Sequence, residues 1–236
     1  MREKKDEFLP PKASLGGVSE PMRVAVVDYG SGNLQSVMQA IRAVVRDAGL
    51  SHEAVLTDDA AEVARADYVV LPGVGAFADC AAGIRSLPDM TQTLERRVLQ
   101  DGCPFLGICV GMQLMASRGL EDGNTPGFGW LAGDVSAITP SPDGLVPRKI
   151  PHMGWNSLTF VQDHPVFTGC EDGMAVYFLH GYAFQGEEKV ILAETDYGGP
   201  VVAAIGRDNM IGLQFHPEKS QNTGQKIMTN WLQWKP

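Results

Sequence analysis

The sequence predicts an α/β protein with three layers, in which helices cover both faces of an open, mostly parallel sheet. Two observations support this class. In the first half of the chain, short and almost continuous apolar runs alternate with apolar residues at helical spacing. Such runs are typical of strands buried on both faces, and short joints between strand and helix favour right-handed crossovers. In the second half, β-like runs follow one another between clusters of Gly, Pro and Asp, which indicates additional antiparallel strands.

The first half contains the predicted parallel core. Apolar residues recur at helical spacing from Leu34 to Val45, and Gly49 is expected to end that helix. Similar apolar patterns predict the other elements. The expected strands are residues 23–28, 54–56, 68–71 and 105–108, and the expected helices are residues 34–48, 90–99 and 110–117.

The second half is expected to contribute mainly strands before a closing helix. The expected strands are residues 129–138, 157–160, 176–179, 190–193, 201–205 and 211–215, and the helix is 222–231. The proline-rich stretch 139–147 is expected to be a surface loop. Residues 1–21 are polar and predicted to be a disordered tail, and residues 22–236 are predicted to form one domain.

The composition is that of an ordinary soluble protein, with 44% hydrophobic and 20% charged residues in a chain of 236. The formal net charge of −9 argues against a nucleic-acid partner, since no excess of Lys and Arg is available to neutralise phosphates. No apolar run approaches the ~18 residues of a membrane span. The polar N-terminus lacks the apolar segment of a signal peptide, so we expect a cytoplasmic protein with no membrane partner.

Cys109 lies between two glycines, in the run Gly107-Ile108-Cys109-Val110-Gly111, at a predicted strand-to-helix junction. This spacing matches the nucleophile elbow, with Cys in place of Ser. Flanking glycines leave room for a strained backbone, and a helix that begins at Val110 directs its positive end at the sulfur. The amide of Val110 is also available to an oxyanion. The alternative is a buried structural cysteine. We interpret Cys80, Cys103 and Cys170 in this way, because none of them has this glycine spacing.

A histidine and a glutamate follow the last predicted strand, in the run Phe215-His216-Pro217-Glu218. Pro217 breaks the strand, so both side chains should project from the sheet edge where ligands of open α/β sheets gather. Glu218 would accept from one ring nitrogen of His216 and leave the other to face Cys109. The alternative is a surface turn with no role in chemistry.

Two glycine-rich turns also follow predicted strands. Residues 72–75, Pro-Gly-Val-Gly, lack a complete phosphate-binding pattern. We interpret them as an oxyanion strand whose glycines permit a peptide flip. Residues 29–33 are interpreted either as a plain helix N-terminus capped by Asn33 or as a binding turn.

The motifs together resemble those of the class I (triad) glutamine amidotransferases, whose fold is flavodoxin-like. Within that family the chain looks like the branch that serves imidazole glycerol phosphate synthesis in histidine biosynthesis. The resemblance covers essentially the whole chain from Met22. The matching segments are residues 28–34, 72–77, 107–113, 151–156, 177–180 and 214–220.

The resemblance implies a role for particular residues. Cys109 would be the nucleophile, His216 the base and Glu218 its orienting partner. Oxyanion positions would be Gly73, Val74 and Val110, and substrate would be held by Gln113, Glu121 and the backbone of Gly181 and Tyr182. The partner interface would include Asn33, His152, Met153, Trp155, Asn156, Tyr177 and Lys219.

The resemblance further implies hydrolysis of L-glutamine to glutamate and ammonia through a cysteine thioester, with no metal or organic cofactor. Ammonia would pass to a (β/α)8-barrel cyclase subunit in a heterodimer. Residues 151–156 offer an apolar wall with polar ends, which suits either a partner-facing gate or a packed loop. Two rival functions are an elbow-bearing cysteine peptidase or stress-response relative, and a non-catalytic glutamine sensor.

Overall fold

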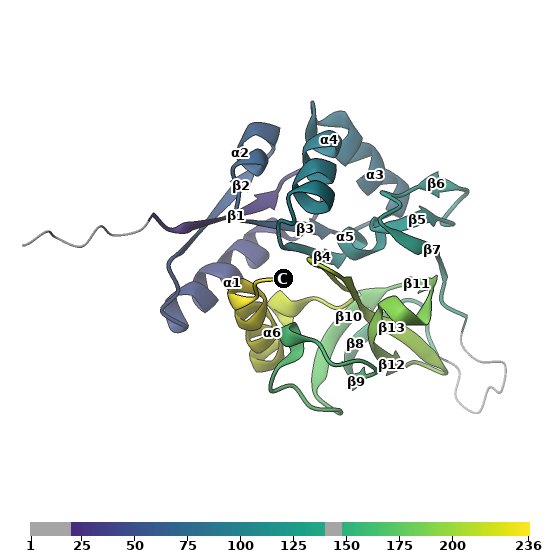
Figure 1. Ribbon diagram of the computed structural model, residues 1–236. Helices are drawn as coiled ribbons and strands as arrows, with labels where there is room; N and C mark the ends of the chain where they lie inside the picture. Colours follow the sequence, from purple (N-terminus) through teal and green to yellow (C-terminus); the bar gives the residue numbers. More distant parts are fainter. Residues whose placement is uncertain (1–19, 140–147) are drawn as a thin grey trace, which may run out of the picture.

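The structure is a computed structural model that describes residues 20–139 and 148–236. Its centre is an eight-stranded sheet in the order β2-β1-β3-β4-β14-β13-β12-β9 (Figure 1). From β2 to β14 neighbouring strands are parallel, and from β14 to β9 they are antiparallel. The strands of this sheet are β1 (Met22–Val27), β2 (His52–Thr57), β3 (Tyr68–Gly73), β4 (Phe105–Cys109), β9 (Thr159–Phe160), β12 (Ile191–Asp196), β13 (Pro200–Arg207) and β14 (Met210–Leu213).

The helices cover both faces of the parallel part of the sheet. Figure 1 shows α1 and α6 together on one face and α2, α3 and α4 on the other. The central strands β3 and β4 are fully buried because they are covered on both sides, which explains their continuous apolar sequences. The helices are α1 (Leu34–Asp47), α2 (Ala60–Ala64), α3 (Phe77–Ser86), α4 (Met90–Glu95), α5 (Val110–Gln113) and α6 (Gln221–Gln233).

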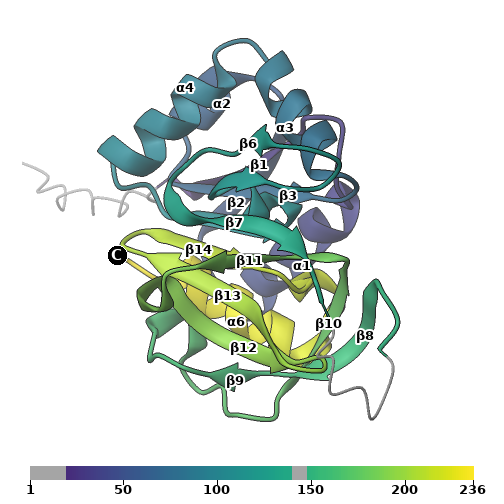
Figure 2. The same cartoon turned by 90° about the vertical axis from the view of Figure 1, so that its right-hand side faces the viewer.

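Two smaller sheets accompany the main sheet, one beside its antiparallel half and one that also contacts α3 and α5. Figure 2 shows β8 and β10 side by side at one edge of the molecule. The second small sheet has the order β11-β7-β5-β6. Their strands are β5 (Ala116–Gly119), β6 (Thr125–Pro126), β7 (Leu131–Ala137), β8 (His152–Ser157), β10 (Ala175–His180) and β11 (Tyr182–Gly186).

The mixed α/β class with a mostly parallel main sheet is confirmed, and antiparallel strands do follow in the second half. The predicted helix over 110–117 is wrong in its length. It ends at Gln113, and Ala116–Gly119 instead forms β5, which pairs with β6 and β7. Pairing with strands distant in sequence overrides the local helical preference.

Three other predicted elements differ from the structure. The helix over 90–99 becomes α4 followed by a π-helical segment, Arg96–Gln100. The strand over 157–160 is two strands in different sheets, because β8 ends at Ser157 and β9 begins at Thr159. Residues 151–156 are largely strand β8 and not a packed loop.

Several elements were not predicted at all, namely α2, α3, β6 and β11. Nearly all of the proline-rich stretch, residues 140–147, and nearly all of the predicted tail, residues 1–19, lie outside the described residues. Among the helices that the structure describes, none combines the length and the apolar character needed to cross a membrane.

Candidate active site

Cys109 is the last residue of β4 and lies directly before α5. Its backbone has φ 54° and ψ −110°, a positive φ that residues other than glycine rarely adopt. Holding such a residue costs roughly 1–3 kcal/mol, and strain of this kind clusters at functional sites. The conformation is the elbow that the sequence predicts at this junction.

The glycines on either side of Cys109 are required by close approach of backbone. A Cβ on Gly111 would lie 1.8 Å from the carbonyl oxygen of Leu71, and one on Gly107 would lie 2.7 Å from the carbonyl oxygen of Gly111. Gly73 pairs with Cys109 across β3 and β4, and a Cβ there would lie 2.7 Å from the Gly111 nitrogen. The absence of these side chains lets α5 lie directly against the sheet.

His216 and Glu218 form a buried pair. His216 Nδ1 lies 2.9 Å from Glu218 Oε1, and the two side chains are 2% and 1% exposed. The backbone of His216 is fixed by two more hydrogen bonds: its N–H donates to the Tyr177 carbonyl at 2.9 Å, and its carbonyl accepts from Ser220 Oγ at 2.6 Å. Strand β10 therefore anchors the segment that carries the imidazole.

The environment of His216 favours its charged form. Burial disfavours an imidazolium, but hydrogen bonding and charge interaction with Cys109 and Glu218 outweigh burial and raise the pKa of His216 to about 9. Among the described residues, buried Nε2 of His216 has no well-aligned hydrogen-bond partner, although Cys109 is close enough to influence its pKa. At neutral pH the ring is therefore a proton donor beside the sulfur.

Cys109 and His216 line the same pocket, which has a volume of about 240 Å³. This is smaller than the ~300–1,000 Å³ of sites for drug-sized ligands and suits a small metabolite. The pocket lies where β3, β4 and β14 end, at the carboxyl edge of the parallel strands. It is lined by Val74, Gly75, Cys109, Val110, Gln113, Glu121, Pro151, Leu179, His180, Gly181, Tyr182, His216 and Lys219.

The expected substrate residues all line this pocket. Gln113 Nε2 donates to the Tyr182 carbonyl and to Gln214 Oε1, each at 3.0 Å. Glu121 Oε2 accepts from the Phe77 N–H at 2.8 Å, so its carboxylate is held at the start of α3. The pocket thus has a carboxylate and an amide held at fixed positions in its lining.

The expected oxyanion residues lie around the elbow, with Val74 and Val110 in the pocket lining and Gly73 paired with Cys109. Val74 is tied to the turn after β1. Its carbonyl accepts from Ser31 Oγ at 2.5 Å, and its N–H donates to the same oxygen at 3.4 Å. Cys80 Sγ also donates to the Val74 carbonyl at 3.3 Å. In this conformation the Val74 N–H is engaged outside the pocket.

The expected interface residues differ in their exposure. Met153 is 65% and Trp155 49% exposed on β8, whereas His152 of the same strand is 2% exposed. Lys219 lies with its Nζ 5.8 Å from the centre of the Tyr177 ring. Asn33 is the N-cap residue of α1 but makes no side-chain capping bond.

Two polar residues of the site were not predicted as site residues. Gln214 is fully buried, and its Nε2 donates to Cys109 Sγ at 3.8 Å. His180 lines the pocket and is bonded at both ring nitrogens. Gln214 lies in the motif segment 214–220 and His180 in the segment 177–180. Their nearness in sequence to His216 and Tyr182 was the only signal that could have marked them as site residues.

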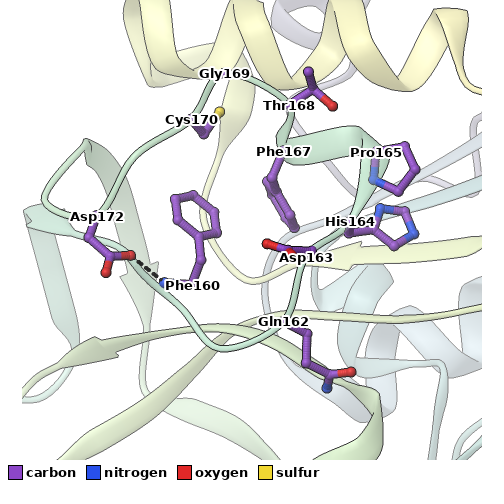
Figure 3. Close-up of a pocket in the computed structure, with 10 residues that line it drawn as sticks. All are labelled: Phe160, Gln162, Asp163, His164, Pro165, Phe167, Thr168, Gly169, Cys170 and Asp172. Carbon is purple, nitrogen blue, oxygen red and sulfur yellow. Dashed lines mark hydrogen bonds between the residues drawn. The ribbon is translucent and has the colours of Figure 1, made fainter.

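A wider hollow of about 700 Å³ lies elsewhere, between β9 and the segment that follows it. Figure 3 shows that His164 and Cys170 lie on different sides of this hollow, with Phe167 between them. His164 Nδ1 accepts from the Val166 N–H at 3.2 Å. The hollow therefore does not repeat the Cys–His arrangement. Within residues 20–139 and 148–236, no three His, Cys, Asp or Glu side chains are grouped to hold a metal ion.

The fold and the site together define a glutamine amidotransferase of class I. The model of the family described as "Glutamine amidotransferase class-I" matches residues 25–234, and the chain belongs to this family. Solved structures agree at the level of the fold. One glutamine amidotransferase superposes with a TM-score of 0.64 at 16% identity, covering 89% of this chain and 97% of that one. Another, from Thermotoga maritima, gives a TM-score of 0.59 at 20% identity, covering 87% and 80%.

Relatives at higher identity narrow the family further. The imidazole glycerol phosphate synthase subunits HisH of Mesorhizobium japonicum and Brucella suis are 51% and 52% identical over 219 residues, which is 91% of this chain and all of each relative. That of Rhodospirillum rubrum is 51% identical over 217 residues, with the same coverage. The chain belongs with these HisH subunits.

Proposed function

We propose that this chain hydrolyses L-glutamine on Cys109 and supplies the ammonia to a cyclase subunit of imidazole glycerol phosphate synthase in histidine biosynthesis. Membership of the HisH family supports the pathway and the glutaminase activity. The observation that carries the mechanism is the convergence of Cys109 and the His216–Glu218 pair on one small pocket. Gln113 and Glu121 line the same pocket and provide groups for the amino-acid end of the substrate.

The chemistry follows from the positions of the proton donor and the nucleophile. The Cys109 thiolate, beside protonated His216, attacks the carboxamide carbon of glutamine, and the carbonyl electrons move to oxygen. When this tetrahedral adduct collapses, the C–N bond breaks and protonated His216 gives its proton to the leaving nitrogen, which departs as ammonia. His216, now neutral, takes a proton from water as water attacks the thioester. Collapse of this second adduct breaks the C–S bond and restores the Cys109 thiolate beside protonated His216, while the new carboxyl group of glutamate gives its proton to solvent.

The developing oxyanion requires donors that the pocket can present. Val110 supplies one backbone N–H next to the sulfur, and Val74 would supply another after its peptide turns. Each such donor contributes roughly 3 kcal/mol to stabilising the transition state. Since the Val74 N–H is bonded to Ser31 here, full activity requires that this bond be exchanged.

The partner surface is proposed on the β8–β10 sheet. Met153 pairs with Leu179 and Trp155 pairs with Tyr177 across these strands. Met153, Trp155 and Leu179 are exposed large apolar residues, and Leu179 also lines the pocket. An apolar patch that adjoins the reaction pocket is suited to a partner that receives ammonia without its loss to solvent.

The test is synthesis by the complex with a (β/α)8-barrel cyclase. Cys109→Ala should abolish glutamine-dependent synthesis and leave synthesis from added ammonia intact. Cys170→Ala, which changes a cysteine in the separate hollow, should leave both activities unchanged. If glutamine-dependent synthesis survived in Cys109→Ala, the proposed nucleophile would be wrong.

A further inference from the structure

The active-site pocket contains a second histidine, His180, that the reaction above does not use. Its Nε2 lies 3.1 Å from Nδ1 of buried His152, and its Nδ1 lies 2.9 Å from the Tyr182 carbonyl oxygen. With both nitrogens engaged, His180 cannot exchange protons with substrate as a free base.

The direction of the hydrogen bond between His152 and His180 follows from the Tyr182 carbonyl, which can only accept. The Tyr182 carbonyl requires His180 to donate from Nδ1, so Nε2 of a neutral His180 accepts from the Nδ1–H of His152. His152 Nε2 then accepts from Asn156 Nδ2, which lies 3.3 Å away. Asn156 Nδ2 also donates to the Asp196 carbonyl at 2.8 Å.

The neutral state that this pattern requires is favoured by the surroundings. Burial lowers the pKa of both imidazoles to about 4, helped by the positive charge of Arg148 near His152. The hydrogen bond to the Tyr182 carbonyl partly opposes the lowering of the His180 pKa, whereas the charge interactions with His152 and His216 lower this pKa further. At neutral pH each ring therefore has one donor and one acceptor, as the chain of bonds demands.

The series of hydrogen bonds continues to the catalytic groups through one shared acceptor. The Tyr182 carbonyl accepts from both His180 and Gln113, so His180 helps to fix the oxygen that orients the Gln113 amide. The second proton of that amide goes to Gln214 Oε1, and Gln214 Nε2 donates to Cys109 Sγ. The bonds thus connect Asn156 on β8 to the sulfur without interruption.

Asn156 and His152, where this series of hydrogen bonds begins, lie behind the proposed partner surface. Along β8 the side chains alternate, so that His152 is buried while Met153 and Trp155 are exposed. A strand places neighbouring residues on opposite faces. The residues that carry the bonds inward and those that face outward therefore share one rigid element.

From this arrangement, and resting on the proposed glutaminase function, we propose that His152 and His180 are positioning residues for glutamine. They act as neutral donors in series that fix the Tyr182 carbonyl and the Gln113 amide at the amino-acid end of the pocket. The Nδ1–H of His152 is the link that matters. Its loss should raise KM for glutamine more than it lowers kcat, because the groups displaced bind substrate in the ground state.

The test replaces the two ring nitrogens of His152 separately. In His152→Asn the side-chain amide can occupy the place of Nδ1 and donate to His180, whereas in His152→Gln it reaches the place of Nε2 and cannot. We expect KM to rise roughly tenfold in His152→Gln and in His180→Phe, with kcat within about threefold, and His152→Asn to recover most of the loss. His164→Phe, which changes a histidine in the separate hollow, is the control.

The readouts separate this inference from the proposed function. Ammonia-dependent synthesis should persist in every His152 and His180 variant, and Cys109 should still be labelled by a glutamine-analogue electrophile at saturating concentration, with half-labelling shifted to higher concentration in His152→Gln and His180→Phe. If wild type showed no glutamine hydrolysis with the cyclase, the proposed function would fail. Equal KM in wild type and His152→Gln, or equal impairment of the Asn and Gln variants, would overturn the positioning role alone.

A measurement on the unmodified protein covers the case in which variants do not fold. Long-range ¹H–¹⁵N NMR spectra distinguish the two neutral tautomers of histidine. We expect both His152 and His180 to be protonated at Nδ1 at pH 7. An Nε2–H tautomer, or a charged ring, at either position would contradict the series of bonds.

Discussion

Val74 donates its backbone N–H to Ser31 Oγ, and the same hydroxyl donates to the Val74 carbonyl. Both peptide groups of the expected oxyanion residue are therefore held by one side chain from the turn after β1. An amide committed to Ser31 cannot also donate to an oxyanion in the pocket. Of the two donors in the proposed mechanism, Val110 and Val74, this conformation therefore lacks the second.

Removal of the Ser31 hydroxyl should release this segment. We predict that Ser31→Ala raises glutaminase activity of the isolated protein by about tenfold, the effect of roughly 1.4 kcal/mol in a conformational equilibrium. Activity is measured as ammonia release without the cyclase. Ser86→Ala removes a hydroxyl that bonds to the Gly83 carbonyl and should have no effect. Unchanged activity in Ser31→Ala would mean that this bond does not restrain Val74.

Glu218→Gln should lower the pKa of His216. Without the carboxylate, one of the two groups that oppose the effect of burial is lost, so the pKa of His216 measured by NMR should fall from about 9, while the interaction with Cys109 remains. The dependence of the free energy of unfolding on pH should also become weaker. In wild type the protonated ring stabilises the folded state fully below pH 6.5, and this contribution is lost as the pH rises through about 9.

The alkaline loss of stability should accordingly be smaller in Glu218→Gln than in wild type. Glu187→Gln removes an exposed carboxylate that pairs with Lys189 and serves as the control. A His216 pKa that stayed near 9 in Glu218→Gln would show that the carboxylate does not stabilise the charged ring.

Gly111→Ala should destabilise the elbow. The added Cβ would lie 1.8 Å from the Leu71 carbonyl oxygen, so α5 would have to move from the sheet. We expect a loss of roughly 2–4 kcal/mol in the free energy of unfolding and loss of glutaminase activity. Gly181→Ala adds a methyl group to the same pocket at an ordinary 3.5 Å from Ile150, and should fold with near wild-type stability. Equal stability of the two variants in denaturant titrations would refute the packing argument.

Trp155→Ala should weaken binding of the cyclase. Exposed tryptophans in interfaces often contribute about 2 kcal/mol or more, which corresponds to roughly a 30-fold rise in Kd. Leu99→Ala is a matched control, because Leu99 and Trp155 are both 49% exposed. Leu99 precedes the start of β4, whereas the pocket lies at the end of that strand. Titration calorimetry that gave the same Kd for both variants would place the interface elsewhere.

Acid should destabilise the folded state through the buried histidine pair. The pKa of each ring is about 4 in the folded protein and ordinarily 6.5, so between these values the unfolded chain binds more protons. The free energy of unfolding should therefore fall as the pH drops from 6.5 to about 4. His152→Asn removes one titrating group and should reduce that decrease in denaturant titrations. An identical pH dependence would count against burial of a neutral His152.

Much of this protein can be predicted from local sequence. The strands β1, β3 and β4 are continuous apolar runs, and such runs have few alternatives to a buried parallel sheet. The elbow at Cys109 and the proline-broken segment at His216 are equally local, because glycine permits conformations that other residues avoid and proline fixes the backbone, wherever they occur. These features were sufficient to indicate that the thiol and the imidazole meet at one edge of the sheet.

Only the tertiary structure decided which polar groups become connected. Gln113 reaches Gln214 across 101 positions of sequence, and His152 reaches His180 across 28. The same is true of the helix expected over residues 110–117, whose second half became β5 because β6 and β7 were available to pair with it. Local patterns specify what a segment can form. Pairing partners and buried hydrogen bonds are settled by segments distant in sequence, whose proximity no single stretch of chain encodes.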